Sequence, residues 1–357
     1  MSDRTFVGLD VHARSTVGYA LDPGSGQAWL RRMGADPGEV VGWVTALPGQ
    51  VQAGYEAGPT GYGLARLLQA AGVPTVVLAP SKIARPAGDK VKTDVRDAQL
   101  LAQLLAMGEY ASVRIPTEAE ESARDLWRLR VAIAGDTRRA KQRIGHLLLR
   151  RGIVYDGSTW TQGHLRWLRQ VHFQDPMDAR VYETTLDTVL FAIDRLKALD
   201  ADLGPLAAAS EYAPVMARLA CLRGISTITG YGLATEIGDW QRFTGRSIGA
   251  YLGLVPSEHS SGPSRTQGGL TRTGNQHARR LLIEASWQHL KAYRRSKDLL
   301  ARMAAAGPAA AARGHAGNRR LHHRWLSFEA RNKKRNQANA AIARELAGWC
   351  WSLATMD

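Results

Sequence analysis

Short apolar runs and turn residues alternate through the first part of the chain, a pattern typical of consecutive strands. The turn at residues 22–26 joins two of these runs as a hairpin. Apolar residues at helical spacing predict helices at 36–47 and 62–71, the second ending at Gly72. The strands are predicted at residues 5–12, 17–21, 27–33, 51–57 and 75–80.

The order of these elements indicates a known architecture. It runs three strands, helix, strand, helix, strand, and then a helix that begins near Asp94. This order fits a ribonuclease-H-like mixed sheet with helices on its faces, in which strands 1 and 4 lie side by side at the centre. The predicted fold class is therefore α/β, followed by a mainly α remainder.

Helical spacing dominates the remainder of the chain. Residues 118–151 predict a basic amphipathic helix, and residues 155–174 resemble a connector. The apolar residues of 178–209 recur in steps of three and four, which favours a coiled-coil arm contacting a second subunit. A helical hairpin within one chain explains the same spacing. The tail at 291–335 is again basic, apart from a Gly/Ala-rich interruption at 304–317. We expect three domains, at 1–155 (acid-bearing sheet with the basic helix), 156–212 (coiled-coil connector) and 213–357 (C-terminal domain).

Positive charge is concentrated after the first third of the chain. The 357 residues carry a formal net charge of +15. Residues 1–122 hold 11 Lys and Arg against 13 Asp and Glu, a net charge of −2, so the remaining 235 residues carry +17. Such an excess favours a polyanion, above all nucleic acid, over a merely solvated surface. The residues expected to bind nucleic acid are Arg124, Arg128, Arg138, Arg139, Lys141, Arg143, Arg265, Arg272, Arg279 and Arg280.

The cysteines and the apolar runs bear on the compartment. Cys221 and Cys350 are far apart and lack CxxC spacing, so neither a disulfide nor a structural zinc site is predicted. No apolar run approaches the roughly 18 residues of a membrane span. The N-terminus lacks a basic region followed by an apolar signal segment. We therefore expect a cytoplasmic protein with no membrane partner.

Four carboxylates lie where predicted elements begin or end. Asp10 closes the first strand and Glu56 closes the fourth, while Asp94 and Asp97 share one face at the start of a helix. If the topology holds, all four meet at one sheet edge, and a divalent cation relieves their repulsion. Oxygen ligands favour Mg²⁺ or Mn²⁺, and two such ions about 4 Å apart can promote phosphodiester transfer. Alternatively, Asp94 caps the helix, Asp97 complements its dipole, and the other two are ordinary strand-end residues.

A polar loop at residues 257–265 contains Ser261-Gly262 close to several arginines. A serine that loses its proton while phosphate charge develops suits phosphoryl transfer, because guanidinium groups stabilise that charge. By composition alone, a flexible phosphate-binding loop fits equally well. Residues 222–230 resemble a helix-hairpin-helix turn, whose backbone N–H groups can hold a phosphate, but a plain turn between helices is as consistent.

Several motifs, in this order across nearly the whole chain, resemble the insertion-sequence transposases usually called the IS one-ten family. The first half resembles the DEDD signature of that family, and the second half resembles its C-terminal domain. The motifs are Gly8–His12, Tyr55–Ala57 and Lys92–Ala98, then Glu236–Asp239, Tyr251–Pro256, Ser261-Gly262 and Gly274-Asn275 with Arg279-Arg280.

The resemblance implies a DNA recombinase with a RuvC-like domain, a coiled-coil connector and a serine-bearing transposase domain. It implies double-stranded donor and target DNA as substrates, guided by a non-coding bridge RNA, with homo-oligomers (a dimer or tetramer) as the working form. A covalent phosphoserine link is thought to form in a composite site shared by two subunits. Carried over by motif, Asp10, Glu56, Asp94 and Asp97 are the metal ligands and Ser261 is the nucleophile.

Three alternatives stay open at the level of sequence. Ser260 precedes Ser261 and Ser264 follows closely, so the nucleophile is assigned only to within these neighbours. A structure-selective, metal-dependent nuclease of the junction-resolvase type would use the four acids and water, with no covalent intermediate. A non-enzymatic nucleic-acid-binding protein would keep the acids as a structural remnant.

Overall fold

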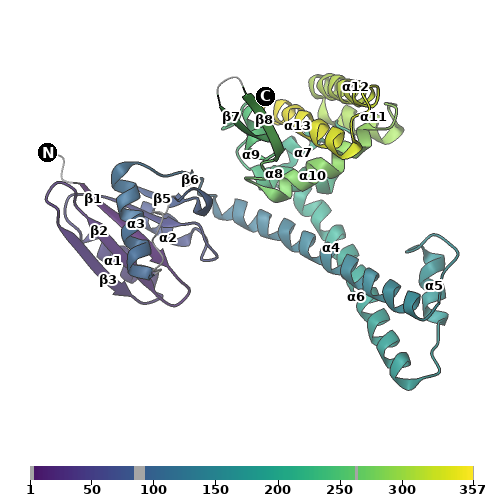
Figure 1. Ribbon diagram of the computed structural model, residues 1–357, viewed down its shortest axis with the longest axis horizontal. Coiled ribbons are helices and arrows are strands. Elements are labelled where there is room, and N and C mark those ends of the chain that lie inside the picture. Colours follow the sequence, from purple (N-terminus) through teal and green to yellow (C-terminus); the bar gives the residue numbers. More distant parts are fainter. Residues whose placement is uncertain (1–3, 84–92, 262–263, 357) are drawn as a thin grey trace. The chain divides into compact units, whose positions relative to one another are not determined.

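The computed structural model describes the backbone of residues 4–83, 93–261 and 264–356, and the side chains of these ranges outside 259–265. The chain divides into two compact units, Met1–Thr117 and Glu118–Asp357, which are coloured along the sequence in Figure 1. The predicted division at residues 155 and 212 concerns functional modules and stays a prediction.

A six-stranded mixed sheet forms the first unit, in the order β3-β2-β1-β4-β5-β6. Strands β1, β4 and β5 are parallel, and the other neighbours are antiparallel. The predicted strands and the central β1–β4 pair are confirmed, whereas β6 has only two residues and was missed. The strands are β1 (Arg4–Val11), β2 (Thr16–Leu21), β3 (Ala28–Met33), β4 (Gln50–Glu56), β5 (Thr75–Leu78) and β6 (Ser112–Val113).

Helices cover both faces of this sheet. The core on one face includes Leu9 and Tyr55 together with side chains of α1 (Pro37–Thr45) and α2 (Gly63–Ala70). The opposite face carries α3 (Asp94–Met107), whose Leu101 and Leu105 are buried against Leu78. A short 3₁₀ helix, η1, spans Pro80–Lys82. Because side chains alternate along a strand, residues next to Leu9 and Tyr55 face α3.

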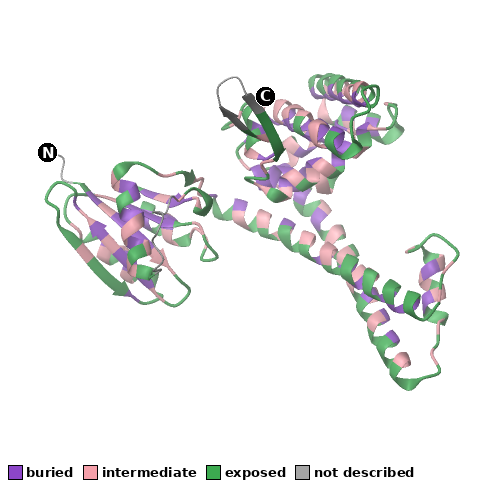
Figure 2. Ribbon diagram, in the orientation of Figure 1, coloured by how far each residue is buried: buried purple, intermediate pink, exposed green. Residues whose placement is uncertain are grey.

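Two long helices open the second unit and pack against each other within the same chain. They are α4 (Glu118–Arg150) and α6 (Pro176–Ala208), linked through the short α5 (Gln162–Gln170). Leu186 and Val189 of α6 are buried in the core that this pair forms with α5. The apolar spacing of α6 thus serves an intrachain hairpin, and the subunit contact stays a prediction. Figure 2 shows exposed residues along most of the remaining surface of both helices.

The rest of the second unit is helical apart from one hairpin, and its largest core joins α7 to α13. The Gly/Ala-rich stretch at 304–317 of the basic tail is helical apart from Gly307. None of the helices in the described ranges is long and apolar enough to cross a membrane. The elements are α7 (Ala213–Leu219), α8 (Thr227–Ile237), α9 (Ser247–Tyr251), β7 (Pro256–Ser261), β8 (Ser264–Leu270), α10 (Gln276–Ser286), η2 (Trp287–His289), α11 (Lys297–Ala306), α12 (Pro308–Glu329) and α13 (Arg335–Ala354).

Candidate active site: an acidic cluster and a serine hairpin

The end of strand β1 is held against helix α3 by a glycine. A Cβ atom on Gly8 would lie 2.1 Å from the carbonyl oxygen of Ala98, so only glycine allows this approach. Gly54 pairs with Gly8 in register on β4, and a Cβ there would come within 2.9 Å of Leu78. Asp10 lies two residues beyond Gly8 and therefore faces α3 as well. The glycine contact thus sets the distance between Asp10 and the first turn of α3.

Helix α3 begins with its own cap. Thr93 is the N-cap, and its side-chain oxygen accepts a hydrogen bond from the backbone N–H of Arg96 at 3.3 Å. Asp94 is the first helical residue, and Asp97 completes the first turn. The alternative in which Asp94 caps the helix is therefore wrong. Because Thr93 is the cap, neither Asp94 nor Asp97 is needed for capping. Both carboxylates lie in the first turn, where the helix dipole favours negative charge.

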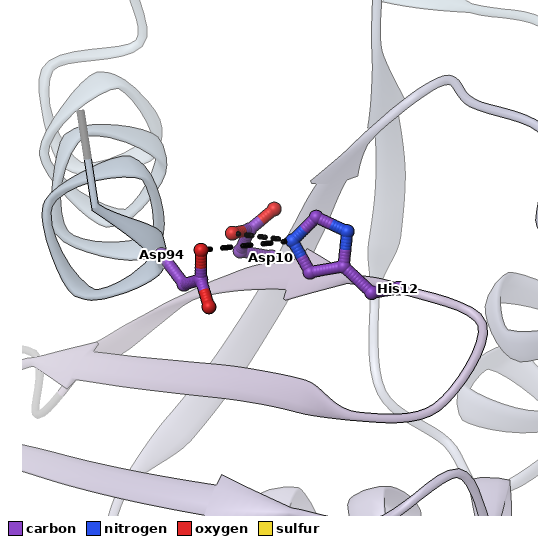
Figure 3. Close-up of side chains that lie close together, drawn as sticks. All are labelled: Asp10, His12 and Asp94. Carbon is purple, nitrogen blue, oxygen red and sulfur yellow. Dashed lines mark hydrogen bonds and ion pairs between the residues drawn. The ribbon is translucent and has the colours of Figure 1, made fainter.

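Asp10, His12 and Asp94 converge (Figure 3). Nε2 of His12 lies 3.1 Å from Oδ2 of Asp10 and 3.8 Å from Oδ1 of Asp94. One potential ligand atom from each of the three residues lies within 4.8 Å of the other two. His12 was not predicted as part of the site. The sequence spacing could have predicted its contribution, since His12 lies two residues after Asp10 and so on the same side of an extended chain.

Like charges surround Asp10, which is also the least exposed member of this cluster. Its side chain is 19% exposed, against 50% for Asp94 and 53% for His12. Burial raises the pKa of the Asp10 carboxyl; His12 opposes that rise, and the negative charges of Asp94 and Asp97 add to it. A bound cation would remove this penalty. The donor set of two carboxylates and an imidazole is one that a divalent metal accepts.

Glu56 and Asp97 lie near this cluster without belonging to its closest group. Glu56 follows Tyr55, which pairs with Leu9, so it ends β4 at the same sheet edge at which Asp10 ends its strand. Its side chain is exposed, and among the described residues its carboxylate is outside the group of atoms within 4.8 Å. Asp97 is close enough for its charge to act on Asp10. The sheet thus brings the predicted acids to one edge, with Asp10 and Asp94 closest.

The predicted serine lies at the end of a two-stranded hairpin. Ser261 is the last residue of β7, and its backbone pairs with Ser264, the first residue of β8. Its side chain and residues 262–263 lie outside the described part of the chain. The register places Arg265 opposite Ser260. Ser261 therefore ends the first strand of a β-hairpin, and the prediction of a loop at 257–265 is wrong for the described residues of that stretch, which belong to the two strands.

The base of this hairpin is tightly packed at two glycines with positive φ. A Cβ on Gly253 (φ 62°) would lie 2.5 Å from the backbone of Thr273, and one on Gly274 (φ 68°) would lie 1.7 Å from the carbonyl oxygen of Tyr251. Arg279 adds hydrogen bonds to two backbone carbonyls here, at 3.0 Å to Leu252 and 2.8 Å to Thr273. The segments flanking both strands are thereby fixed to the helical core.

A buried carboxylate joins this base to helix α4. The side chain of Glu236 is 0% exposed, and its two oxygens accept from Nε and Nη2 of Arg128 at 2.9 and 3.0 Å. Asn275, the N-cap of α10, donates to the same carboxylate at 2.8 Å. Burial would raise the pKa of Glu236, but the hydrogen bonds from Arg128 and Asn275 lower it overall. Sequence reasoning missed this network, because the ion pair spans 108 positions.

The basic residues predicted to bind nucleic acid differ in what they contact. Arg124 donates to the carbonyl of Thr235 at 3.3 Å, so it, like Arg128 and Arg279, has an intrachain partner. Two others pair with nearby acids on their own helices, Arg139 with Asp136 and Arg280 with Glu284. Arg138, Arg143 and Arg272 are exposed, Lys141 is half-buried, and the side chain of Arg265 lies outside the described residues.

Comparison with known proteins gives matches along nearly the entire chain. A family model described as Transposase IS116/IS110/IS902 family matches residues 216–301, and a model of DEDD transposases matches residues 7–151. The chain is 36% identical to the putative transposase y4qE of Sinorhizobium fredii, over 98% of this chain and 88% of that protein. It is 29% identical to the transposase for insertion sequence element IS1533 of Leptospira borgpetersenii, over 94% of this chain and 99% of that protein.

Proposed function

We propose that this chain, which belongs to the IS110 family of transposases, exchanges DNA strands through a covalent phosphoserine intermediate. As a member of the family it is an enzyme of DNA transposition. The observation that supports the metal-dependent part of this reaction is the convergence of Asp10 and Asp94 with His12 at the edge of a mixed sheet, while the serine step rests on the family resemblance and on the hairpin that carries Ser261. Such a cluster suits phosphodiester chemistry that depends on a divalent metal.

Asp10 and Asp94 would hold the metal, with Glu56 and Asp97 completing the ligand set. Their oxygen atoms favour Mg²⁺, and the nearby imidazole of His12 also suits Mn²⁺. When bound, the ion supplies Lewis-acid polarisation of a phosphoryl oxygen. In the chain itself, Gly8 and the Thr93 cap hold the carboxylates at one edge of the sheet. When Nε2 of His12 carries the proton, it donates to Oδ2 of Asp10 and so orients that carboxylate.

Ser261 is the proposed nucleophile. Its Oγ gives up a proton, forms a bond to phosphorus, and displaces the oxygen of one DNA strand, which leaves as a hydroxyl once it is protonated. The reverse reaction with a second strand end completes the exchange. Support comes from the position of Ser261 at the end of the first strand of a hairpin whose base is anchored by Arg279. Ser260 and Ser264 remain the nearest alternatives.

The partners follow from charge and from the family. Double-stranded donor and target DNA would be bound by the basic second unit, on which Arg138 and Arg143 are exposed. A non-coding bridge RNA would select both DNA sites by base pairing. A dimer or tetramer would place the acidic cluster of one subunit with the serine of another. The cytoplasm, at the nucleoid, is the proposed place of action.

The test is a denaturing gel for protein-linked DNA after co-expression with the native flanking sequence and a candidate target. Wild-type protein should form an adduct that resists heat and detergent and disappears on protease treatment. Ser261→Ala should abolish it, whereas the matched control Ser260→Ala should keep it. Cleaved DNA without any adduct in the wild type would favour the metal-only nuclease. Loss in Ser260→Ala alone would move the nucleophile by one residue.

A further inference from the structure

A cavity of about 600 Å³ lies in the long-helix part of the second unit. Its walls come from α4, from residues 159–160 before α5, from α5 itself and from α6. The deeper wall is apolar, with Ile144, Leu148 and Leu168 buried. The polar part is basic, because Arg138, Lys141, His146 and His164 line it and no carboxylate is among the lining residues, all of which are described.

Lys141 is a half-buried cation for which the described part of the chain supplies no counter-ion. Among the described residues, no hydrogen bond or ion pair involves its ammonium group, which instead lies 4.7 Å from the ring centroid of Trp160. Burial lowers the pKa of Lys141. Partly desolvated charges are ordinarily paired, since desolvation disfavours the charged form. An anionic group entering the cavity would supply the missing partner.

Trp160 is held at the cavity in a strained conformation. Its φ is +65°, which is unusual for a bulky residue. A hydrogen bond of 3.1 Å from its backbone N–H to Nδ1 of His164 stabilises this conformation, and Thr161 caps α5 immediately afterwards. The indole ring lies edge-on to His164, with ring centroids 5.1 Å apart. A strained backbone conformation thus places a large aromatic ring on the wall of a basic cavity.

We propose that this cavity binds an unpaired nucleotide, with the base against Trp160 and a phosphate at Lys141 and Arg138. A flat aromatic base next to an anionic phosphate matches an apolar wall beside Lys141 and Arg138, two cations that have no ion pair among the described residues. Aromatic stacking is the common way in which proteins hold unstacked bases. The inference rests on the proposed action on nucleic acid. It adds a site that reads an unpaired base, distinct from the acidic cluster and the serine hairpin.

The test compares two ligands that differ only in the base. One is a labelled duplex with a single-nucleotide bulge, and the other carries an abasic spacer at the bulge; both are made as RNA and as DNA. Binding of the full chain is followed by fluorescence anisotropy with EDTA, so that metal at the acidic cluster plays no part. Wild-type protein should bind the base-bearing bulge roughly tenfold more tightly, a typical effect of one stacked base. A preference in RNA alone would identify an RNA source, and one in DNA alone a DNA source.

Variants assign the roles of the two residues. Trp160→Leu should abolish the preference for the base, and Trp160→Phe, which keeps a smaller ring, should retain part of it. Lys141→Gln should weaken both ligands equally and leave the preference intact. Arg166→Gln, an equal loss of charge at an exposed position on α5 outside the cavity, should not change the preference. If Trp160→Leu fails to fold, Trp160→Phe decides the role of the ring.

Equal wild-type affinity for the two bulges overturns the inference, as does a full preference retained in both Trp160 variants. The proposed function is tested independently. A chain that forms the serine adduct yet ignores the bulged base keeps its proposed chemistry and lacks this site. A chain that prefers the base-bearing bulge but forms no adduct has this site and lacks the proposed serine chemistry.

Discussion

The two halves of the proposed active site are built differently. The acidic cluster rests on a six-stranded sheet, where Gly8 brings α3 into direct backbone contact with β1. The serine is the last residue of the first strand of a two-stranded hairpin, and the packing of this hairpin is concentrated at its base, around Gly253 and Gly274. An isolated pair of strands is only marginally stable by itself. The comparison indicates that the acids are preorganised by the core, whereas the position of the serine depends on how the hairpin base is anchored and on what binds its tip.

The largest effect should come from the acidic half. Replacing Asp10 by Asn removes a charge from the centre of the cluster with little change in volume. We expect strand cleavage to fall by more than about 100-fold, since even changes around metal ligands cost 10- to 100-fold. Cleavage of supercoiled substrate with increasing Mg²⁺ measures the loss. Nearly normal cleavage by Asp10→Asn would show that this cluster is not the metal site.

A second prediction concerns the glycine contact that fixes this cluster. Gly8→Val places side-chain atoms where backbone atoms of α3 lie, so overpacking should cost about 3 kcal/mol. Gly42→Ala is the control, because a Cβ on Gly42 meets nothing within 4 Å. Hydrogen exchange along the full chain should show faster exchange in the first unit for Gly8→Val alone. Unchanged exchange would contradict the assigned role of Gly8.

In the part of the proposed site that carries the serine hairpin, loss of the buried carboxylate of Glu236 should lower stability. Glu236→Gln leaves Arg128 facing a neutral amide, and we expect a cost of about 2 kcal/mol, below that of a fully buried pair because Arg128 is 46% exposed. Urea unfolding of the second unit measures it. The adduct yield should fall as well if the hairpin base positions Ser261, and an unchanged yield would separate the network from the chemistry.

The same carboxylate predicts a pH dependence. The folded pKa of Glu236 lies below its ordinary value of 4.5, so its stabilisation is complete above pH 4.5 and is lost as pH falls through the folded pKa. Unfolding experiments between pH 3 and 6 should therefore show a smaller acid-side loss of stability in Glu236→Gln than in wild type. Parallel pH profiles for the two proteins would contradict the lowered pKa.

The smallest effect should come from an exposed ion pair on α10. Arg280 and Glu284 are about half exposed and lie one helical turn apart, at 2.8 Å. Glu284→Gln should change the free energy of unfolding by less than about 0.5 kcal/mol, as for other i,i+4 surface pairs. It serves as the matched control for Glu236→Gln. A larger loss would show that surface charge in this unit is structurally important.

Much of the fold could be predicted from local pattern. Alternating apolar residues identified β1 to β5, but β6 has too few residues to produce a pattern. Glycine is a poor helix former, yet Gly314 lies inside the helix α12. In the structure, a Cβ on Gly314 would lie 2.4 Å from Cβ of Cys221. Close helix packing therefore outweighs intrinsic propensity there, and sequence alone does not reveal that packing.

The candidate site was predictable to the extent that it follows from topology. Asp10 and Asp94 meet because parallel strands end together and α3 packs on that face. The contribution of His12 required side-chain geometry, as did the cap at Thr93, where a neighbouring aspartate was an equally good candidate. Glu236 belongs to one of the motifs that carry the resemblance, but its ion pair gave no local signal, since its partners come from α4 and the start of α10.

The central claim is that the acids and the serine take part in one reaction, contributed by different subunits. Complementation tests it most directly, with Asp10→Asn and Ser261→Ala chains of different size mixed in the presence of guide RNA, DNA and Mg²⁺. Neither chain alone should form an adduct. The mixture should restore it, and only on the Asp10→Asn chain, which keeps its serine. No adduct in the mixture, beside a normal wild-type adduct, would contradict a site shared between subunits.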